Sequence, residues 1–83
     1  MDGTKAAVEI VVLDRGFVYV GDVAEAGENI TIRNAKNIRC WGTTKGLGEL
    51  VNGPTKNTVI DNVGEIIAPK RAVIHRILCK QGW

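Results

Sequence analysis

Arg39 and Trp41 are the two side chains best suited to gripping a ligand. They lie two residues apart in a stretch whose alternation predicts a strand, so both point to the same side of it. Ile38 and Cys40 point the other way and are assigned to the core. A planar cation beside a large aromatic ring forms a platform on which a base or a partner side chain can stack. The alternative is that Trp41 packs in a second core layer or at a subunit contact, while Arg39 pairs with a carboxylate.

The segment that follows Trp41 carries the parts of an anion site. Glycines, threonines and lysines recur over residues 42–57, where they offer backbone N–H groups, hydroxyl donors and cations. The candidate ligand-binding residues are Arg39, Trp41, Thr43, Thr44, Lys45, Gly46 and Lys56. Neither half of the segment matches the phosphate-binding pattern G-x-x-x-x-G-K-[ST], so a nucleoside-triphosphatase loop is rejected. The alternative interpretation is a flexible polar loop.

The histidine, cysteine and acidic residues form no predicted catalytic group and no predicted metal site. The chain has no serine, and its one histidine, His75, would lie about 13 Å from Cys79 on a strand that rises ~3.3 Å per residue. No acidic partner for a cysteine–histidine pair can be assigned. Glu49, Asp61 and Glu65 show no spacing typical of a general acid and base. The sequence therefore predicts a protein that is not an enzyme and has no cofactor or metal, with solvated carboxylates and a packed histidine.

The elements that must position these residues are strands. Apolar residues make up 45% of the chain and are mostly valine and isoleucine, which favour strands. About seven short strands are predicted, over residues 7–13, 17–23, 28–33, 38–41, 58–61, 65–68 and 71–79. The fold class is therefore all-β: a single domain over residues 1–83, built as a small sandwich or partly open barrel. Residues 39–58 form its long glycine-, threonine- and lysine-containing loop region.

Two of the predicted strands are apolar on both faces. In residues 7–13 and 71–79, apolar side chains alternate onto both sides, whereas one small core hides only one face of each strand. The second face needs a second sheet or a neighbouring subunit, so we expect a homo-oligomer. The alternative is a well-closed monomeric barrel.

Charge, cysteine content and hydropathy limit the classes of partner that we expect. The net charge of +2 is too small to predict nucleic-acid binding, which we regard as unfavoured. Cys40 and Cys79 are too few for a disulfide framework and are predicted to be reduced and buried. No apolar run approaches the ~20 residues of a membrane helix, and no signal peptide is visible, so we expect no membrane partner.

The stretch from Ile38 to Leu50 resembles the signature of a family of small proteins encoded by tailed phages and prophages. Its pattern is R-x-W-G-T-T-x-G-L-G-E-L, and Gly53-Pro54-Thr55 follows it. The opening over residues 8–21 and Trp83 also fit, so the resemblance covers most of the chain. It implies a phage origin and a location in the host cytoplasm, but it brings no settled chemistry.

Phages also encode small oligomeric proteins, called sponges, that sequester nucleotide signals of host immunity. The likeness to these is one of type and not of motif. The expectation is thus a non-catalytic phage protein that binds a small phosphorylated ligand, such as a cyclic nucleotide immune signal. Trp41 would stack on a base, Arg39 and Lys45 would pair with phosphate, and Lys56 would close the site. The alternatives are a structural or assembly protein of the phage particle that uses the same loop as a subunit contact, and a weak single-strand nucleic-acid binder.

Overall fold

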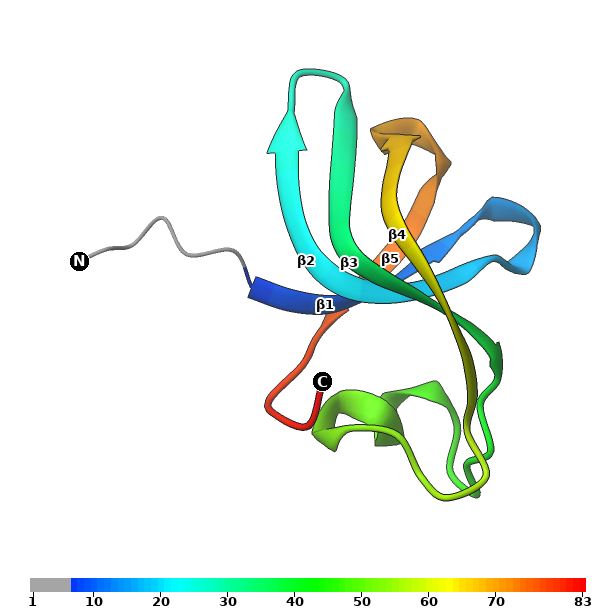
Figure 1. Ribbon diagram of the computed structural model, residues 1–83. Coiled ribbons are helices and arrows are strands. Elements are labelled where there is room, and N and C mark those ends of the chain that lie inside the picture. The colour runs from blue at the N-terminus through cyan, green and yellow to red at the C-terminus, as the bar shows by residue number, and fades with distance from the viewer. Residues whose placement is uncertain (1–6) are drawn as a thin grey trace.

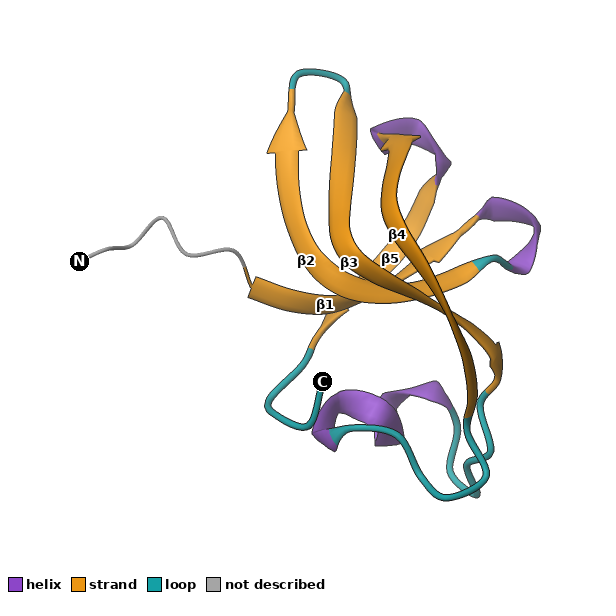
Figure 2. Ribbon diagram, viewed as in Figure 1, coloured by secondary structure: helices purple, strands orange, loops and turns teal. Residues whose placement is uncertain are grey.

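The computed structural model describes residues 7–83 and shows one antiparallel sheet (Figure 1). Its five strands are β1 (Ala7–Leu13), β2 (Val18–Ala26), β3 (Asn29–Cys40), β4 (Val59–Pro69) and β5 (Val73–Leu78). Three short 3₁₀ helices connect them: η1 (Asp14–Gly16), η2 (Leu47–Asn52) and η3 (Lys70–Ala72) (Figure 2). The strand order is β4-β3-β2-β1-β5, in which β5 returns to pair with β1. The all-β class is confirmed, but the sheet is a single open one, and the described residues hold no second sheet to form a sandwich.

The predicted number of strands was wrong because two bulges were taken for turns. The strands predicted at 28–33 and 38–41 are parts of one strand, β3 (29–40), and those predicted at 58–61 and 65–68 are parts of one strand, β4 (59–69). The breaks fall at Asn34 and Gly64, whose φ angles are 53° and 87°. Both residue types tolerate this left-handed backbone, and the register shifts there while the strands continue. Seven predicted strands therefore become five.

One face of the sheet, called here the first face, carries one hydrophobic cluster. Its buried members come from β1, β2, β3 and β4: Val11, Leu13, Val23, Ile30, Ile32, Ala35 and Ala68. The long strands β2 and β3 bend strongly, as Figure 1 shows, and η3 brings the chain from β4 back to β5. As a result Ala72 and Val73 pack against this cluster from the far side of the sheet order. The first face is therefore covered by the sheet's own curvature.

The opposite face, called here the second face, carries another cluster beneath the long loop. Its buried members are Ile10, Val18, Val20, Ile38, Leu47 and Leu50, with Ile77 and Trp83 packed against them. Leu47 and Leu50 come from η2, so the loop covers the sheet. The second face of β1, expected to need a second sheet or a neighbouring subunit, is thus covered by η2, Cys79 and Trp83 of the same chain. This corrects the premise for β1, and the homo-oligomer itself stays a prediction.

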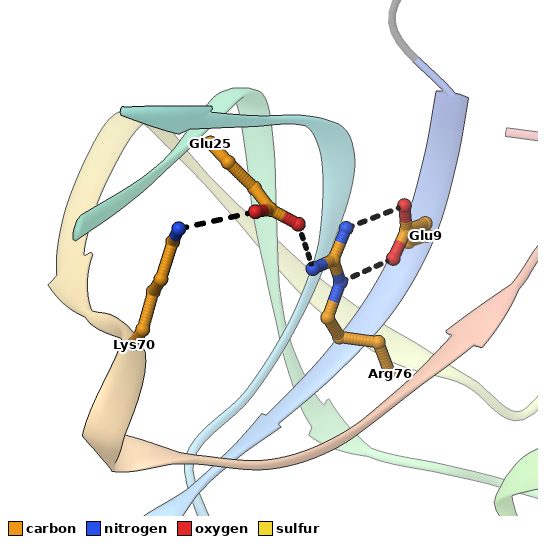
Figure 3. A network of polar contacts seen from close by, with 4 residues as sticks. All are labelled: Glu9, Glu25, Lys70 and Arg76. Atoms are coloured by element: carbon orange, nitrogen blue, oxygen red, sulfur yellow. Dashed lines mark hydrogen bonds and ion pairs between the residues drawn. The ribbon is translucent and has the colours of Figure 1, made fainter. Parts of the chain in front are cut away.

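Four charged side chains tie β5 across the first face (Figure 3). The Arg76 guanidinium donates to both carboxylate oxygens of Glu9, at 2.6 and 2.9 Å, and to Glu25 at 2.9 Å. Lys70 of η3 pairs with the other oxygen of Glu25 at 3.1 Å. The hydrogen bond from Arg76, helped by that from Lys70, holds the pKa of Glu25 below its ordinary value, and the two carboxylates raise the pKa of Arg76. The network joins β1, β2, η3 and β5.

Two single-residue predictions from the strand pattern were wrong. Cys40 is exposed, because β3 ends there and its register with β4 shifts between Ile38 and Cys40. His75 is exposed on β5, which is an edge strand, and is not packed in the core. Cys79 is partly buried against the second face, as expected, and burial raises the pKa of its thiol. Within residues 7–83, no helix is long and apolar enough to cross a membrane.

Candidate functional site

The two ends of the long loop are fastened to each other just beyond β3 and just before β4. The Thr58 hydroxyl donates to the Trp41 carbonyl, and the Thr55 hydroxyl donates to the Gly42 carbonyl, each at 2.7 Å. Gly42 has a φ angle of 65°, and a Cβ atom there would lie 2.3 Å from the carbonyl carbon of Asn57. Only glycine combines this backbone with this close approach. We call this arrangement the loop clasp.

The backbone of Trp41 is held in the loop clasp, whereas its indole ring is exposed. Its carbonyl is held by Thr58, whereas its side chain is 42% exposed and belongs to neither hydrophobic cluster. An exposed indole on a fixed backbone can stack on a planar ligand with little loss of conformational entropy. Val59, at the start of β4, is also exposed and pairs with Cys40, the residue before Trp41, so two exposed apolar side chains lie at this end of the sheet.

Arg39 is already paired within the protein. Its Nε atom lies 2.9 Å from one carboxylate oxygen of Asp61 on β4, and its Nη2 atom donates to the other at 3.3 Å. Both side chains are about half or more exposed, so this pair contributes little to stability. This is the carboxylate pairing foreseen as the alternative for Arg39. A phosphate at this position would have to share Arg39 with Asp61.

The backbone turn predicted to hold phosphate holds the Glu49 carboxylate instead. The N–H groups of Thr44 and Lys45 both donate to Glu49 Oε1 at 3.1 Å. Gly46 follows with a φ angle of 102° and precedes η2, and Glu49 lies in the first turn of that helix. From this position a glutamate side chain can reach back to amides ahead of the helix, as in a capping box. The turn is an anion site already occupied by a group of the chain itself.

The seven candidate residues thus divide into two groups. Trp41 belongs to the loop clasp, Arg39 lies two residues before it on β3, and Lys56 lies in the exposed turn between Thr55 and Thr58. Thr44, Lys45 and Gly46 form the turn around Glu49, and the half-buried Thr43 connects the two groups. Among residues 7–83, no carboxylate lies within ion-pair distance of Lys45 or Lys56.

Three features that shape this region were missed by the sequence reasoning. Glu49 was assigned to solvent, although its place three residues after Gly46 matches a capping position. The hydroxyl groups of Thr55 and Thr58 were given no part in joining the two ends of the loop. Trp83 donates its indole N–H to the Leu50 carbonyl at 2.7 Å and so holds η2 from a position 33 residues away. Only the Glu49 signal was local enough to be found in the sequence.

Two hollows in the surface lie outside the 39–58 region. A cavity of about 70 Å³ lies between Trp83 and residues of β1, β2 and β3, among them Asp22 and Lys36. Ligand pockets span roughly 300–1,000 Å³, so this cavity is too small for a nucleotide. A more open hollow of about 300 Å³ lies between the β2–β3 hairpin tip, at Gly27 and Glu28, and the cations of η3. Its Lys70 is already paired with Glu25.

Comparison of the chain with models of protein families, with characterised proteins and with solved structures gives no match. The resemblance to small phage proteins, drawn from the residues around Trp41, therefore remains a prediction.

Proposed function

We propose that this chain is a non-catalytic binding protein and that the surface around Trp41 takes a small phosphorylated ligand of the nucleotide type. The observation that carries the proposal is the exposed indole of Trp41 on a backbone fixed by the loop clasp. A base would stack on the ring, and phosphate would meet Arg39 and Lys56. The likeness in type to phage sponges suggests an immune signal nucleotide as the ligand, and the resemblance to phage proteins implies that it is sequestered in the host cytoplasm.

Exposure and hydrogen bonding suggest which residues would make first contact. Arg39, Trp41 and Lys56 are exposed, whereas the amides of Thr44 and Lys45 are bound to Glu49. A ligand phosphate would reach those amides only after displacing the Glu49 carboxylate. Replacing Glu49 by glutamine removes the competing charge, so Glu49→Gln should strengthen phosphate binding if the turn takes part.

The test is a thermal-shift screen with cyclic di- and trinucleotides and with ADP-ribose derivatives. For a ligand that stabilises the parent, Trp41→Ala should weaken binding by about 1–3 kcal/mol through lost stacking. Arg39→Ala should weaken it by about 2 kcal/mol through lost charge-assisted hydrogen bonds. Ile67→Ala, which removes an exposed apolar side chain opposite Thr31 at the other end of β4, is the matched control and should leave binding unchanged.

The screen also identifies the results that refute the proposal. No shift with any of these nucleotides would remove it, and so would a shift that Trp41→Ala leaves intact. The melting temperature without ligand should change little in Trp41→Ala, because the ring lies outside both clusters.

A second candidate function is a structural or assembly role, with the same region as a subunit contact. The exposure of both Trp41 and Val59 favours it, since together they offer apolar surface at one end of the sheet. In that case the protein should co-purify with phage particles, and Trp41→Ala should disturb assembly without any nucleotide effect.

A further inference from the structure

Besides the surface around Trp41, the unpaired edge of β5 is a surface that could bind a partner. β5 pairs with β1 on one side only, and it lies at the end of the strand order. Ile74 and Leu78 on this strand are 60% and 64% exposed. An edge strand with open backbone groups and apolar side chains is a template for pairing with another strand.

The hydrogen-bond pattern shows which residues of β5 face outward. Cys79 donates its N–H to the Val8 carbonyl at 3.0 Å, so this pair is hydrogen-bonded. Hydrogen-bonded pairs alternate along an antiparallel ladder, and the same register continues through Ile77. Arg76 and Leu78 therefore turn their N–H and C=O groups away from β1. No other described backbone group bonds to them, and Ile74 has no partner on β1.

These outward residues are self-complementary under a two-fold axis. If β5 pairs antiparallel with a copy of itself about Arg76, Ile74 of each chain lies opposite Leu78 of the other. Both exposed apolar residues are then covered at once. Registers shifted by two residues in either direction pair fewer of the outward backbone groups and leave an apolar residue opposite Arg76.

The one objection to this register is the meeting of two Arg76 side chains at the axis. Each of them is already held by Glu9 and Glu25, and Figure 3 shows the guanidinium turned toward these carboxylates. With Lys70 included, the network has two positive and two negative groups and no net charge. The two copies therefore approach without charge repulsion at this point.

The opposite edge of the sheet is less regular than β5. Pairing β4 with its own copy about Val63 would set Asp61 opposite Glu65, two carboxylates that already pair with Arg39 and Arg33, and would set Val59 opposite Ile67. The register of β4 with β3 shifts at three places, however, so this edge is not a continuous template. Its bulge at Gly64 also interrupts the edge. We therefore propose that a second copy of this chain docks antiparallel along β5, with Ile74 and Leu78 packed against each other across a two-fold axis. The inference does not rest on the proposed ligand.

The test is the mass of the particle in solution, measured by light scattering after gel filtration over a dilution series. The parent should show twice the 9.0 kDa of one chain at high concentration. Ile74→Glu and Leu78→Lys should each shift the protein toward monomer. Ile67→Lys, at an equally exposed isoleucine on β4, is the matched control and should stay dimeric.

The register is tested by mixing the two β5 variants. In a mixed dimer, the new carboxylate and the new amine lie opposite each other, while the second site keeps its native pair. Mixing should therefore restore the dimer mass, and so should the double substitution in one chain. This restoration also shows that the single variants are folded.

Three results would overturn the inference. The first is a parent that remains at 9.0 kDa at every concentration. The second is an assembly that β5 variants leave intact. The third is a set of single β5 variants that dissociate but are not restored by mixing.

Discussion

Leu50→Ala tests whether the long loop is part of the hydrophobic core. Leu50 lies in η2, is fully buried against the second face, and its carbonyl accepts the Trp83 indole N–H. Replacing a buried leucine by alanine costs about 2–5 kcal/mol, because transfer energy is lost and a cavity remains. A domain of this size loses about 4–8 °C in Tm for each kcal/mol. We expect a loss of about 3 kcal/mol, or at least ~12 °C, from these relations.

The assay is urea unfolding followed by tryptophan fluorescence and circular dichroism. Val51→Ala is the matched control, because Val51 neighbours Leu50 but belongs to neither cluster, and its carbonyl accepts the Lys80 and Gln81 N–H groups whatever its side chain. The control should lose much less stability. Equal small losses in both variants would refute the packing of η2 on the sheet and would support a flexible loop.

Three further predictions follow from the loop clasp, the charged network and the thiols. Gly42→Ala should lower the free energy of unfolding by more than about 1 kcal/mol, since alanine is strained in left-handed backbone; an unchanged denaturation midpoint would contradict the clasp. The pKa of Glu25 is lowered in the folded state, mainly by Arg76, so its contribution to stability is present above the ordinary value of 4.5 and is lost as pH falls through the lowered pKa. Acid unfolding of Glu25→Gln should lack this part of the pH dependence, and a curve parallel to the parent's would count against the network. Cys40 should react with a thiol reagent faster than Cys79, whose thiol pKa is raised by burial; mass spectrometry of singly labelled protein would show the reverse order if either assignment is wrong.

Local sequence chemistry determined the class of structure and the position of the strands. Valine and isoleucine at alternating positions favour strands wherever they lie, so the ranges 7–13 and 71–79 were located close to β1 and β5. The same alternation assigned Ile38 to the core, and Ile38 is buried in the cluster of the second face. These properties depend on near neighbours in the chain, which is why a single sequence carries them.

The tertiary structure alone decided how the strands continue and what the long loop does. Asn34 and Gly64 favour left-handed backbone in turns and in bulges alike. Only the pairing of β3 with β4 shows that each strand continues past these residues as a bulge and does not end in a turn. Leu47 and Leu50 are too few to predict burial in a glycine-rich loop, and their cover depends on Trp83 at the far end of the chain. Such contacts join residues distant in sequence, and their free energy arises only after the sheet has formed and bent. Local propensity depends only on neighbouring residues, so these long-range contacts can be identified only in the folded structure.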